Sequence, residues 1–265
     1  MLPIDYTLLE QQGNITTIAP PESVLTKSAV DLTNPNEARL FLETYGEMIK
    51  AQDLNAAATF FANWIRGLTM AQQYMVSLCS SQVDLSVENL TVHLLMRNGY
   101  ANICFQLNDA TEIMPAAGQH ESFRNVTLER FYGSTVTPLM ESMAEAGRAP
   151  LGQLWGQLPL TLWSFTQKMH SMVTDEADKL RIDEDYLYIR NEMSLEVFKR
   201  KRNPFEMKFK EIDNPYNPSE PYWMRPACCQ SYRIGEYTYC YVCPKLTREQ
   251  REIKKAEIEA TVASR

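Results

Sequence analysis

The chain has 265 residues, of which 45% are hydrophobic and 22% are charged, and its formal net charge is −7. This composition is typical of a globular protein and excludes a mainly disordered chain. The acidic excess argues against a nucleic-acid partner, because such binding relies on basic side chains that contact phosphates. The first thirty residues contain no basic stretch followed by an apolar one, so we expect no secretory signal and a cytoplasmic location.

The N-terminal 36 residues show little regular apolar spacing. Gly13, the Pro20-Pro21 pair and the Asn34-Pro35-Asn36 triplet interrupt any helical or strand period. We therefore expect residues 1–36 to form an arm that packs across the surface. The helical body is expected to follow at residues 37–200.

Apolar side chains recur every three or four residues through much of this body, as in amphipathic helices. Asn36 is the expected N-cap of the first helix. The predicted helices cover residues 37–51, 54–80, 121–147 and 151–181, the last broken near Pro159. The uncharged run 149–167 contains two prolines and two glycines, so it predicts buried helices rather than a membrane span. At most a peripheral membrane association is expected.

Two β-forming segments interrupt the helical pattern. Residues 90–97 and 100–107 are predicted strands, and Asn98-Gly99 between them is the favoured two-residue turn of a hairpin. The chain is thus predicted to be mainly α with a few antiparallel β-strands, an α+β fold. A hairpin near 90–107 would be set into a compact helical body.

Residues 201–265 form a separate C-terminal segment in this interpretation. Residues 205–210 alternate apolar and charged side chains and predict a strand, whereas residues 214–221 are rich in turn-forming residues. Thr247 and Gln250 have the spacing of a capping box at the start of a charged terminal helix.

This segment also contains four of the six cysteines, within sixteen residues: Cys228, Cys229, Cys240 and Cys243. Cys79 and Cys104 are solitary, and we expect them to be small buried apolar residues. Disulfide bonds are unfavourable in a cytoplasmic chain. The four clustered cysteines are therefore predicted to bind a metal centre.

The spacing bears on which metal is bound. A zinc ribbon places two Cys-x-x-Cys pairs on one tetrahedral ion, but only Cys240 and Cys243 have that spacing here. Cys228 and Cys229 are adjacent, and adjacent side chains of an extended backbone point to opposite faces. A [2Fe-2S] cluster takes four thiolates on two iron atoms and presents a wider target. The spacing favours iron–sulfur and leaves zinc open.

The pattern Cys-Cys, ten residues, Cys-x-x-Cys, with Gln230, Tyr232 and Arg233 after the first pair, resembles the C-terminal signature of the FhuF-type ferric siderophore reductases. The resemblance is strong over residues 225–243 and loose elsewhere, in the Trp-containing segments 63–68 and 154–163. It implies a [2Fe-2S] cofactor on the four cysteines and one-electron reduction of an Fe(III)-siderophore, which releases Fe(II). The N-terminal arm and the charged tail after Cys243 depart from the family pattern.

The resemblance also implies roles for residues near the cluster. Gln230 and Tyr232 would donate hydrogen bonds to sulfur, and Arg225 and Arg233 would favour the more negative, reduced cluster. Trp223 and Arg225 would border the ferric siderophore, which is expected to bind against the exposed side of the cluster with Arg225 or Arg233 beside it. Beyond the cluster, no catalytic residue is expected. The implied partner is an electron donor such as ferredoxin or a flavin-dependent reductase.

One basic run stands out on this acidic chain and consists of Lys199, Arg200, Lys201 and Arg202. It is either a docking patch for an anionic ferric siderophore or a solvated charge run at a helix end. Two other functions stay open at this point. One is a non-enzymatic siderophore-binding module in which the four cysteines hold a structural zinc ion, and the other is an electron-transfer shuttle without a substrate site.

Overall fold

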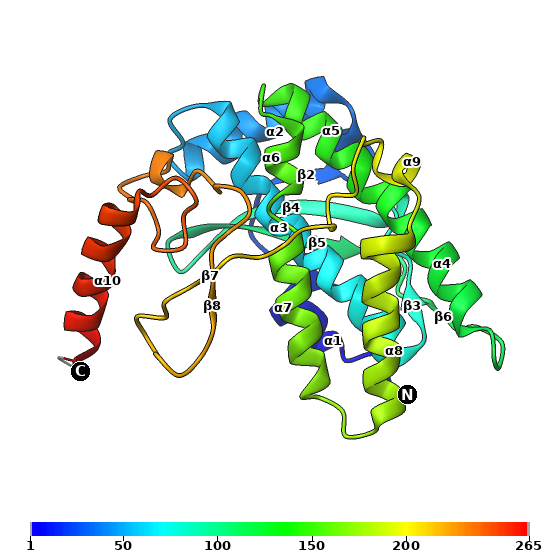
Figure 1. Cartoon of the computed structure of the whole chain (residues 1–265). Coiled ribbons are helices and arrows are strands. Elements are labelled where there is room, and N and C mark those ends of the chain that lie inside the picture. Colours follow the sequence, from blue (N-terminus) through cyan, green and yellow to red (C-terminus); the bar gives the residue numbers. More distant parts are fainter. Residues whose placement is uncertain (1, 264–265) are drawn as a thin grey trace.

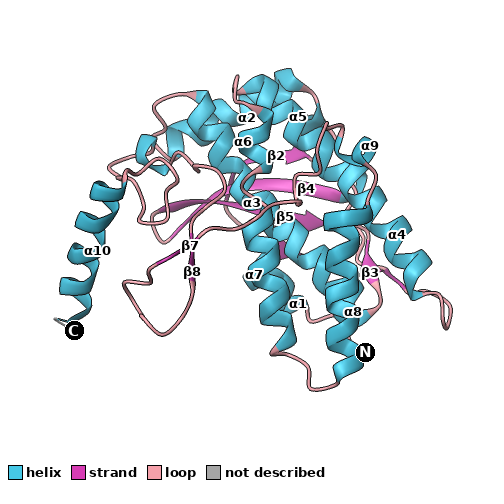
Figure 2. Cartoon of the chain, in the orientation of Figure 1, coloured by secondary structure: helices cyan, strands magenta, loops and turns pink. Residues whose placement is uncertain are grey.

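A computed structural model describes residues 2–263 of the chain. The fold is mainly helical with small sheets, which confirms the predicted α+β class (Figures 1 and 2). The helices are α1 (Tyr6–Gly13), α2 (Pro35–Met48), α3 (Leu54–Tyr74), α4 (His120–Phe131), α5 (Thr137–Ala146), α6 (Leu151–Trp155), α7 (Pro159–His170), α8 (Glu176–Leu187), α9 (Leu195–Phe198) and α10 (Arg248–Ala263). The strands are β1 (Ile15–Thr16), β2 (Ser23–Ser28), β3 (Gln82–Val83), β4 (Leu90–Arg97), β5 (Tyr100–Leu107), β6 (Glu112–Ile113), β7 (Glu211–Ile212) and β8 (Tyr222–Trp223).

Helix α3 runs through the middle of the molecule (Figure 1). Asp53 caps its N-terminus, because the Asp53 carboxylate accepts a hydrogen bond from the backbone N–H of Ala56. Its buried side chains include both small and large residues, and α1, α2, α5, α6 and α7 all pack against it. A π-helical turn at Met75–Cys79 continues α3, so the helix predicted at residues 54–80 is confirmed.

The largest sheet has the strand order β1-β5-β4-β2. Strands β4 and β5 form the predicted hairpin, with Arg97 paired to Tyr100 across the turn. Asn98 and Gly99 both have positive φ angles, 52° and 80°, as this type of two-residue turn requires. Strand β2 adds to β4 in antiparallel orientation, and β1 adds to β5 in parallel orientation.

The expectation of a surface arm at residues 1–36 is wrong. This segment supplies α1, β1 and β2, and Leu9, Ile15 and Leu32 are buried in the hydrophobic core. The short elements are stabilised by tertiary partners, so their own sequence shows little periodicity. Close packing makes this possible: a Cβ atom on Gly67 would lie 2.6 Å from the carbonyl oxygen of Gly13, so only glycine lets α1 approach α3 so closely.

The first long helix begins earlier than predicted. Asn34, rather than Asn36, is its N-cap, because the Asn34 side chain accepts the backbone N–H of Asn36. Pro35 occupies the first helical turn, where its missing N–H costs nothing. The segment predicted as one helix at residues 121–147 consists of α4, a π-helical turn at Tyr132–Val136 and α5.

The stretch predicted as helical at residues 151–181 divides into α6, α7 and the first part of α8. Among the helices of residues 2–263, none combines the length and the apolar character that a membrane crossing requires. The uncharged run 149–167 instead supplies buried side chains of α6 and α7, among them Leu154, Trp155 and Leu162.

The strand predicted at residues 205–210 is also wrong, because its apolar residues pack separately. The Phe205 ring is fully buried and lies 5.3 Å from the ring of Tyr132, centroid to centroid, whereas Phe209 lies 5.3 Å from Trp163. The only strand pairing close by is that of β7 with β8, within the described chain.

The terminal helix α10 is confirmed with its capping box. The Thr247 hydroxyl accepts the backbone N–H of Gln250 at 3.2 Å, and the Gln250 side chain accepts that of Thr247 at 3.0 Å. Figure 1 shows α10 at the edge of the molecule, away from α4 and α8. Arg251 joins it to the cysteine segment by donating to the carbonyl oxygens of Tyr241 and, at 2.9 Å, Cys243.

Candidate metal centre

The four clustered cysteines lie together in the loop segment that precedes α10. Cys228, Cys229 and Cys243 are buried, and Cys240 is half-buried. Their sulfurs form two pairs. The Cys243 thiol donates to the sulfur of Cys228 with a separation of 3.6 Å, and the Cys240 thiol is hydrogen-bonded to Cys229. The pairing is nested, with the outer two cysteines in one pair and the inner two in the other.

Within residues 2–263, no group of three or more His, Cys, Asp or Glu side chains surrounds one position as the ligands of a single ion would. Two thiolates bound at about 2.3 Å to one tetrahedral metal lie roughly 3.8 Å apart, which is close to the separation of the Cys228 and Cys243 sulfurs. A [2Fe-2S] cluster takes two thiolates on each iron atom. Two sulfur pairs therefore fit this cluster, whereas a single zinc ion would require both pairs to converge.

Hydrogen bonds and charge distinguish the sulfurs. The hydrogen bond from Cys240 lowers the pKa of Cys229, and the charge of Arg225 and hydrogen bonds from Ser231 act in the same direction. The same bond, together with burial, raises the pKa of Cys240. Burial raises the pKa of Cys228 to about 11, although the backbone N–H of Gln230 donates to its sulfur at 3.4 Å.

Cys79 and Cys104 lie outside this segment, in the π-helical turn after α3 and in β5. Both are buried, as predicted, with exposed fractions of 6% and 3%. Burial raises the pKa of each thiol to about 11, so both are neutral at physiological pH.

Helix α6 and the residues directly after it hold the backbone of the adjacent cysteines in place. The side-chain amides of Gln153 and Gln157 donate to the carbonyl oxygen of Cys228 at 3.2 and 3.3 Å. Gly156, directly after α6, faces Ala227, and a Cβ atom at Gly156 would lie only 2.5 Å from that of Ala227. The cysteine pair is therefore held by contacts with the helical body.

Gln230 and Arg233 also hold the segment, mainly through α3. The side-chain amide of Gln230 donates to Asn55 at 2.5 Å and to Thr59 at 3.1 Å. Arg233 donates to the Gln230 side-chain oxygen at 2.8 Å and forms an ion pair with Asp53. The predicted hydrogen bond from Gln230 to sulfur exists, but the backbone N–H makes it.

Tyr232 and Trp223 have different surroundings. The Tyr232 hydroxyl accepts a hydrogen bond from Lys245 at 3.1 Å, and its ring stacks on Tyr239 with centroids 4.2 Å apart. Trp223, in β8, packs edge-on against Trp163 with centroids 5.1 Å apart. Trp223 lines a cavity.

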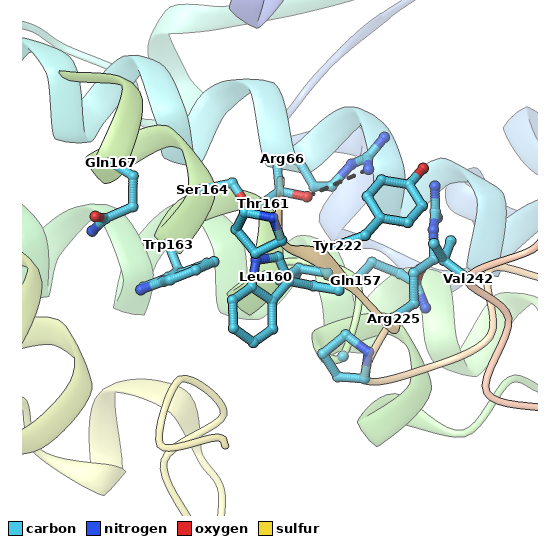
Figure 3. Close-up of a pocket in the computed structure, with 14 residues that line it drawn as sticks. Arg66, Gln157, Leu160, Thr161, Trp163, Ser164, Gln167, Tyr222, Arg225 and Val242 are labelled. Atoms are coloured by element: carbon cyan, nitrogen blue, oxygen red, sulfur yellow. Dashed lines mark hydrogen bonds between the residues drawn. The ribbon is translucent and has the colours of Figure 1, made fainter. Parts of the chain in front are cut away.

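Two cavities adjoin the cysteine segment, and one of them is lined by cysteines. The cysteine cavity, of about 520 Å³, is lined by Cys229, Cys240 and Ser231, by residues of α3 that include Trp64 and Arg66, and by Gln12 and Asn14 of the N-terminal segment. The tryptophan cavity, of about 670 Å³, is lined by Trp163, Gln167, Tyr222 and Trp223, among other residues (Figure 3). Arg66, Thr161 and Arg225 line both cavities and so form the wall that they share.

Arg66 is the residue at this wall that sequence reasoning missed. It lies far from the cysteines in sequence, and its only signal is its place in the segment 63–68 of the loose family resemblance. Its guanidinium donates to the carbonyl oxygen of Asn63 at 2.9 Å and to the Thr161 hydroxyl at 3.5 Å. Burial, followed by repulsion from Arg225, lowers the pKa of Arg66 to about 10, so the side chain is charged at neutral pH.

The basic run 199–202 does not line either of these cavities. Lys199 follows α9 and pairs with Glu141 at 2.9 Å. Arg200 and Arg202 line a different cavity, of about 530 Å³, together with Gly152 and Trp155. Helix α6 thus contacts the run at Gly152 and the cysteine segment through Gln153.

Comparison with known proteins adds no relative: no protein-family model matches the chain, and no curated protein matches it.

Proposed function

We propose that the chain is a cytoplasmic ferric siderophore reductase in which Cys228, Cys229, Cys240 and Cys243 hold a [2Fe-2S] cluster. The observation that carries this proposal is the arrangement of the four sulfurs in two pairs, of which the pair Cys229 and Cys240 borders a cavity. The resemblance of residues 225–243 to the FhuF-type reductases supports the same function.

The chemistry requires little from the rest of the chain. A bound [2Fe-2S] cluster supplies one electron at a time. Hard oxygen donors hold Fe(III) far better than Fe(II), so the gain of one electron loosens the complex. The electron comes from an external donor, a ferredoxin or a flavin-dependent reductase, and it ends on the iron as Fe(II). No covalent bond to the protein forms and no proton has to move.

The residues around the cysteines have three tasks in this proposal. Cys229 and Cys240 lie in the wall of the cysteine cavity, so a docked ferric complex approaches their sulfurs directly. Arg225 and Ser231 stabilise negative charge on Cys229, which favours the reduced state. Phe60 and Trp64 supply an apolar surface for the organic part of the chelate.

The visible spectrum of protein purified without oxygen tests the proposal, together with metal analysis. We expect charge-transfer bands that bleach with dithionite, and equal amounts of iron and acid-labile sulfide. Addition of a ferric siderophore should restore the oxidised spectrum and release Fe(II), which a colorimetric ferrous chelator detects.

Two outcomes would replace the proposal. A colourless protein with stoichiometric zinc would indicate the non-enzymatic binding module. A reduced cluster that no ferric siderophore reoxidises, but that a redox partner protein does, would indicate an electron-transfer shuttle.

A further inference from the structure

Arg66 and Arg225 form a pair of cations on the wall shared by the two cavities. Arg66 comes from α3, and Arg225 comes from the segment that leads to Cys228. Figure 3 shows the two side chains at one end of the tryptophan cavity, together with Tyr222, while Trp163 and Gln167 lie at the other end. Two parts of the chain that are remote in sequence thus place positive charge at one position.

Neither arginine has a carboxylate partner. The ion pairs formed among residues 2–263 do not include Arg66 or Arg225. Although the chain has 33 acidic residues, no Asp or Glu of its described part lines either cavity. A half-buried cation without a carboxylate beside it is costly, and a bound anion would reduce that cost.

The cysteine sulfurs also interact with both arginines. Arg225 attracts the sulfurs of Cys229 and Cys240, and Arg66 interacts with Cys229 more weakly than with the charge of Arg225. The hydrogen bonds from Arg66 to Asn63 and Thr161 fix its guanidinium at the cavity wall. A planar guanidinium in a fixed position suits the bidentate binding of a carboxylate.

We infer that Arg66 and Arg225 select a ferric chelate that carries free carboxylate groups, and hence a negative charge, over a neutral hydroxamate chelate. This inference rests on the proposed function and names its substrate class. The carboxylates would contact the two arginines at the shared wall, and the iron would face Cys229 and Cys240.

Binding can be measured apart from electron transfer with gallium chelates, because Ga(III) resembles Fe(III) in charge and size but is not reduced under these conditions. Trp64 lines the cysteine cavity, and Trp163 and Trp223 line the tryptophan cavity, so intrinsic tryptophan fluorescence reports occupancy. The full-length protein, purified without oxygen, is titrated with a gallium carboxylate siderophore and with a neutral gallium trihydroxamate.

We expect the carboxylate complex to bind at least tenfold more tightly than the neutral one. Arg66→Gln and Arg225→Gln should each weaken its binding about tenfold or more, because a charge-assisted hydrogen bond is lost, and should weaken the binding of the neutral complex far less. Arg66→Lys, which keeps the charge but not the planar fork, should recover part of the loss. Arg97→Gln at the exposed end of β4 removes the same charge elsewhere and should change neither affinity.

Equal affinity for the two complexes, or carboxylate binding that is insensitive to both glutamine variants, would overturn the inference and leave the cluster proposal intact. A colourless protein would instead overturn the proposed function, while the gallium titrations would still decide the charge selectivity. Should Arg66→Gln fail to fold, the half-buried Arg225 and its variant supply the same test.

Discussion

Apart from the two thiol–thiol contacts, the hydrogen bonds described at Cys228 and Cys229 come from Gln230 and Ser231, which are close to them in the chain. The backbone N–H of Gln230 donates to Cys228, and Ser231 donates to Cys229 through both its hydroxyl and its backbone N–H. Such donors stabilise negative charge on sulfur, and they are the usual means by which a protein adjusts the potential of an iron–sulfur cluster.

Replacement of any of the four clustered cysteines by serine should abolish or strongly weaken the visible bands. Serine oxygen is a poor substitute for thiolate on iron, so the pair that contains the replaced cysteine would lose one of its two ligands. Cys79→Ser and Cys104→Ser should keep the spectrum. Loss of the cluster in Cys79→Ser together with its retention in Cys240→Ser would contradict the ligand assignment.

Ser231→Ala should lower the midpoint potential of the cluster. The variant loses a hydroxyl donor to Cys229, so the more negative, reduced state becomes less stable. We expect a change on the order of 50 mV, since 59 mV corresponds to a tenfold change in a one-electron equilibrium. Tyr232→Phe is the matched control, because the Tyr232 hydroxyl accepts from Lys245. A redox titration in which the midpoint potential shifts only in Tyr232→Phe would contradict the prediction, because Tyr232 and not Ser231 would then be the donor that matters.

Sequence spacing was enough to predict that the four cysteines lie together, but not which side chains hold their segment in place. The partners of Gln230 and Arg233 are Asn55 and Asp53, which approach only because the segment packs on the N-terminus of α3. No local pattern encodes that contact. Arg66 was missed for the same reason, since its role depends on where α3 meets the cysteine segment.

At the scale of the elements, Gly156, directly after α6, packs so closely on Ala227 of the cysteine segment that a larger residue at position 156 does not fit. Gly156→Ala should destabilise the protein by about 1–3 kcal/mol, because the new methyl group overlaps Ala227 and moves Cys228 with it. Denaturant unfolding measures the loss, and the visible spectrum measures cluster retention. Gly46→Ala in α2 is the control, because its Cβ would meet nothing closer than 3.5 Å. Equal stability of the two variants would contradict the tight contact.

Asp53 links two elements, since it caps α3 and pairs with Arg233. Asp53→Ala should cost about 1–2 kcal/mol of unfolding free energy through loss of the cap. Asp53→Asn retains a good cap and loses only a partly exposed ion pair, so its cost should stay at about 1 kcal/mol or less. If chemical denaturation gives the same loss for both variants, the ion pair rather than the cap carries the effect.

Elements with a strong local signal were predictable. The periodicity of α3, the Asn98-Gly99 turn and the capping box of α10 each depend on residues that are neighbours in sequence. The two-residue strand β1 has no such signal, because its pairing with β5 supplies its stability. Residues 205–210 show the converse case, in which an alternating pattern arises from Phe205 and Phe209 packing against different partners.

At the scale of the whole molecule, the basic run 199–202 opposes a net charge of −7. If the run draws in an anionic ferric siderophore, the reduction rate should fall as salt rises, because the Debye length shrinks from ~10 Å at 0.1 M to ~3 Å at 1 M. Replacement of all four residues by glutamine should lower the low-salt rate and flatten the salt dependence.

Stopped-flow reduction of an anionic and a neutral ferric complex checks this prediction. The neutral complex is the control and should respond little to salt. Equal responses of the two complexes, or an unchanged anionic rate in the glutamine variant, would rule out steering by this run. The cluster assignment does not depend on that result.

The nested pairing of the sulfurs has a consequence for which genetic changes this chain can tolerate. Cys228 pairs with Cys243 and Cys229 with Cys240, so the two adjacent residues serve different partners. Substitutions in the ten residues between Cys229 and Cys240 leave this division of partners intact. Insertion of one codon between the adjacent cysteines would leave all four thiols in place, yet it would turn one side chain away from its partner. A lineage of such proteins should therefore accept substitutions in the loop, outside Gln230, Ser231 and Arg233, far more readily than a single added residue at the Cys-Cys junction.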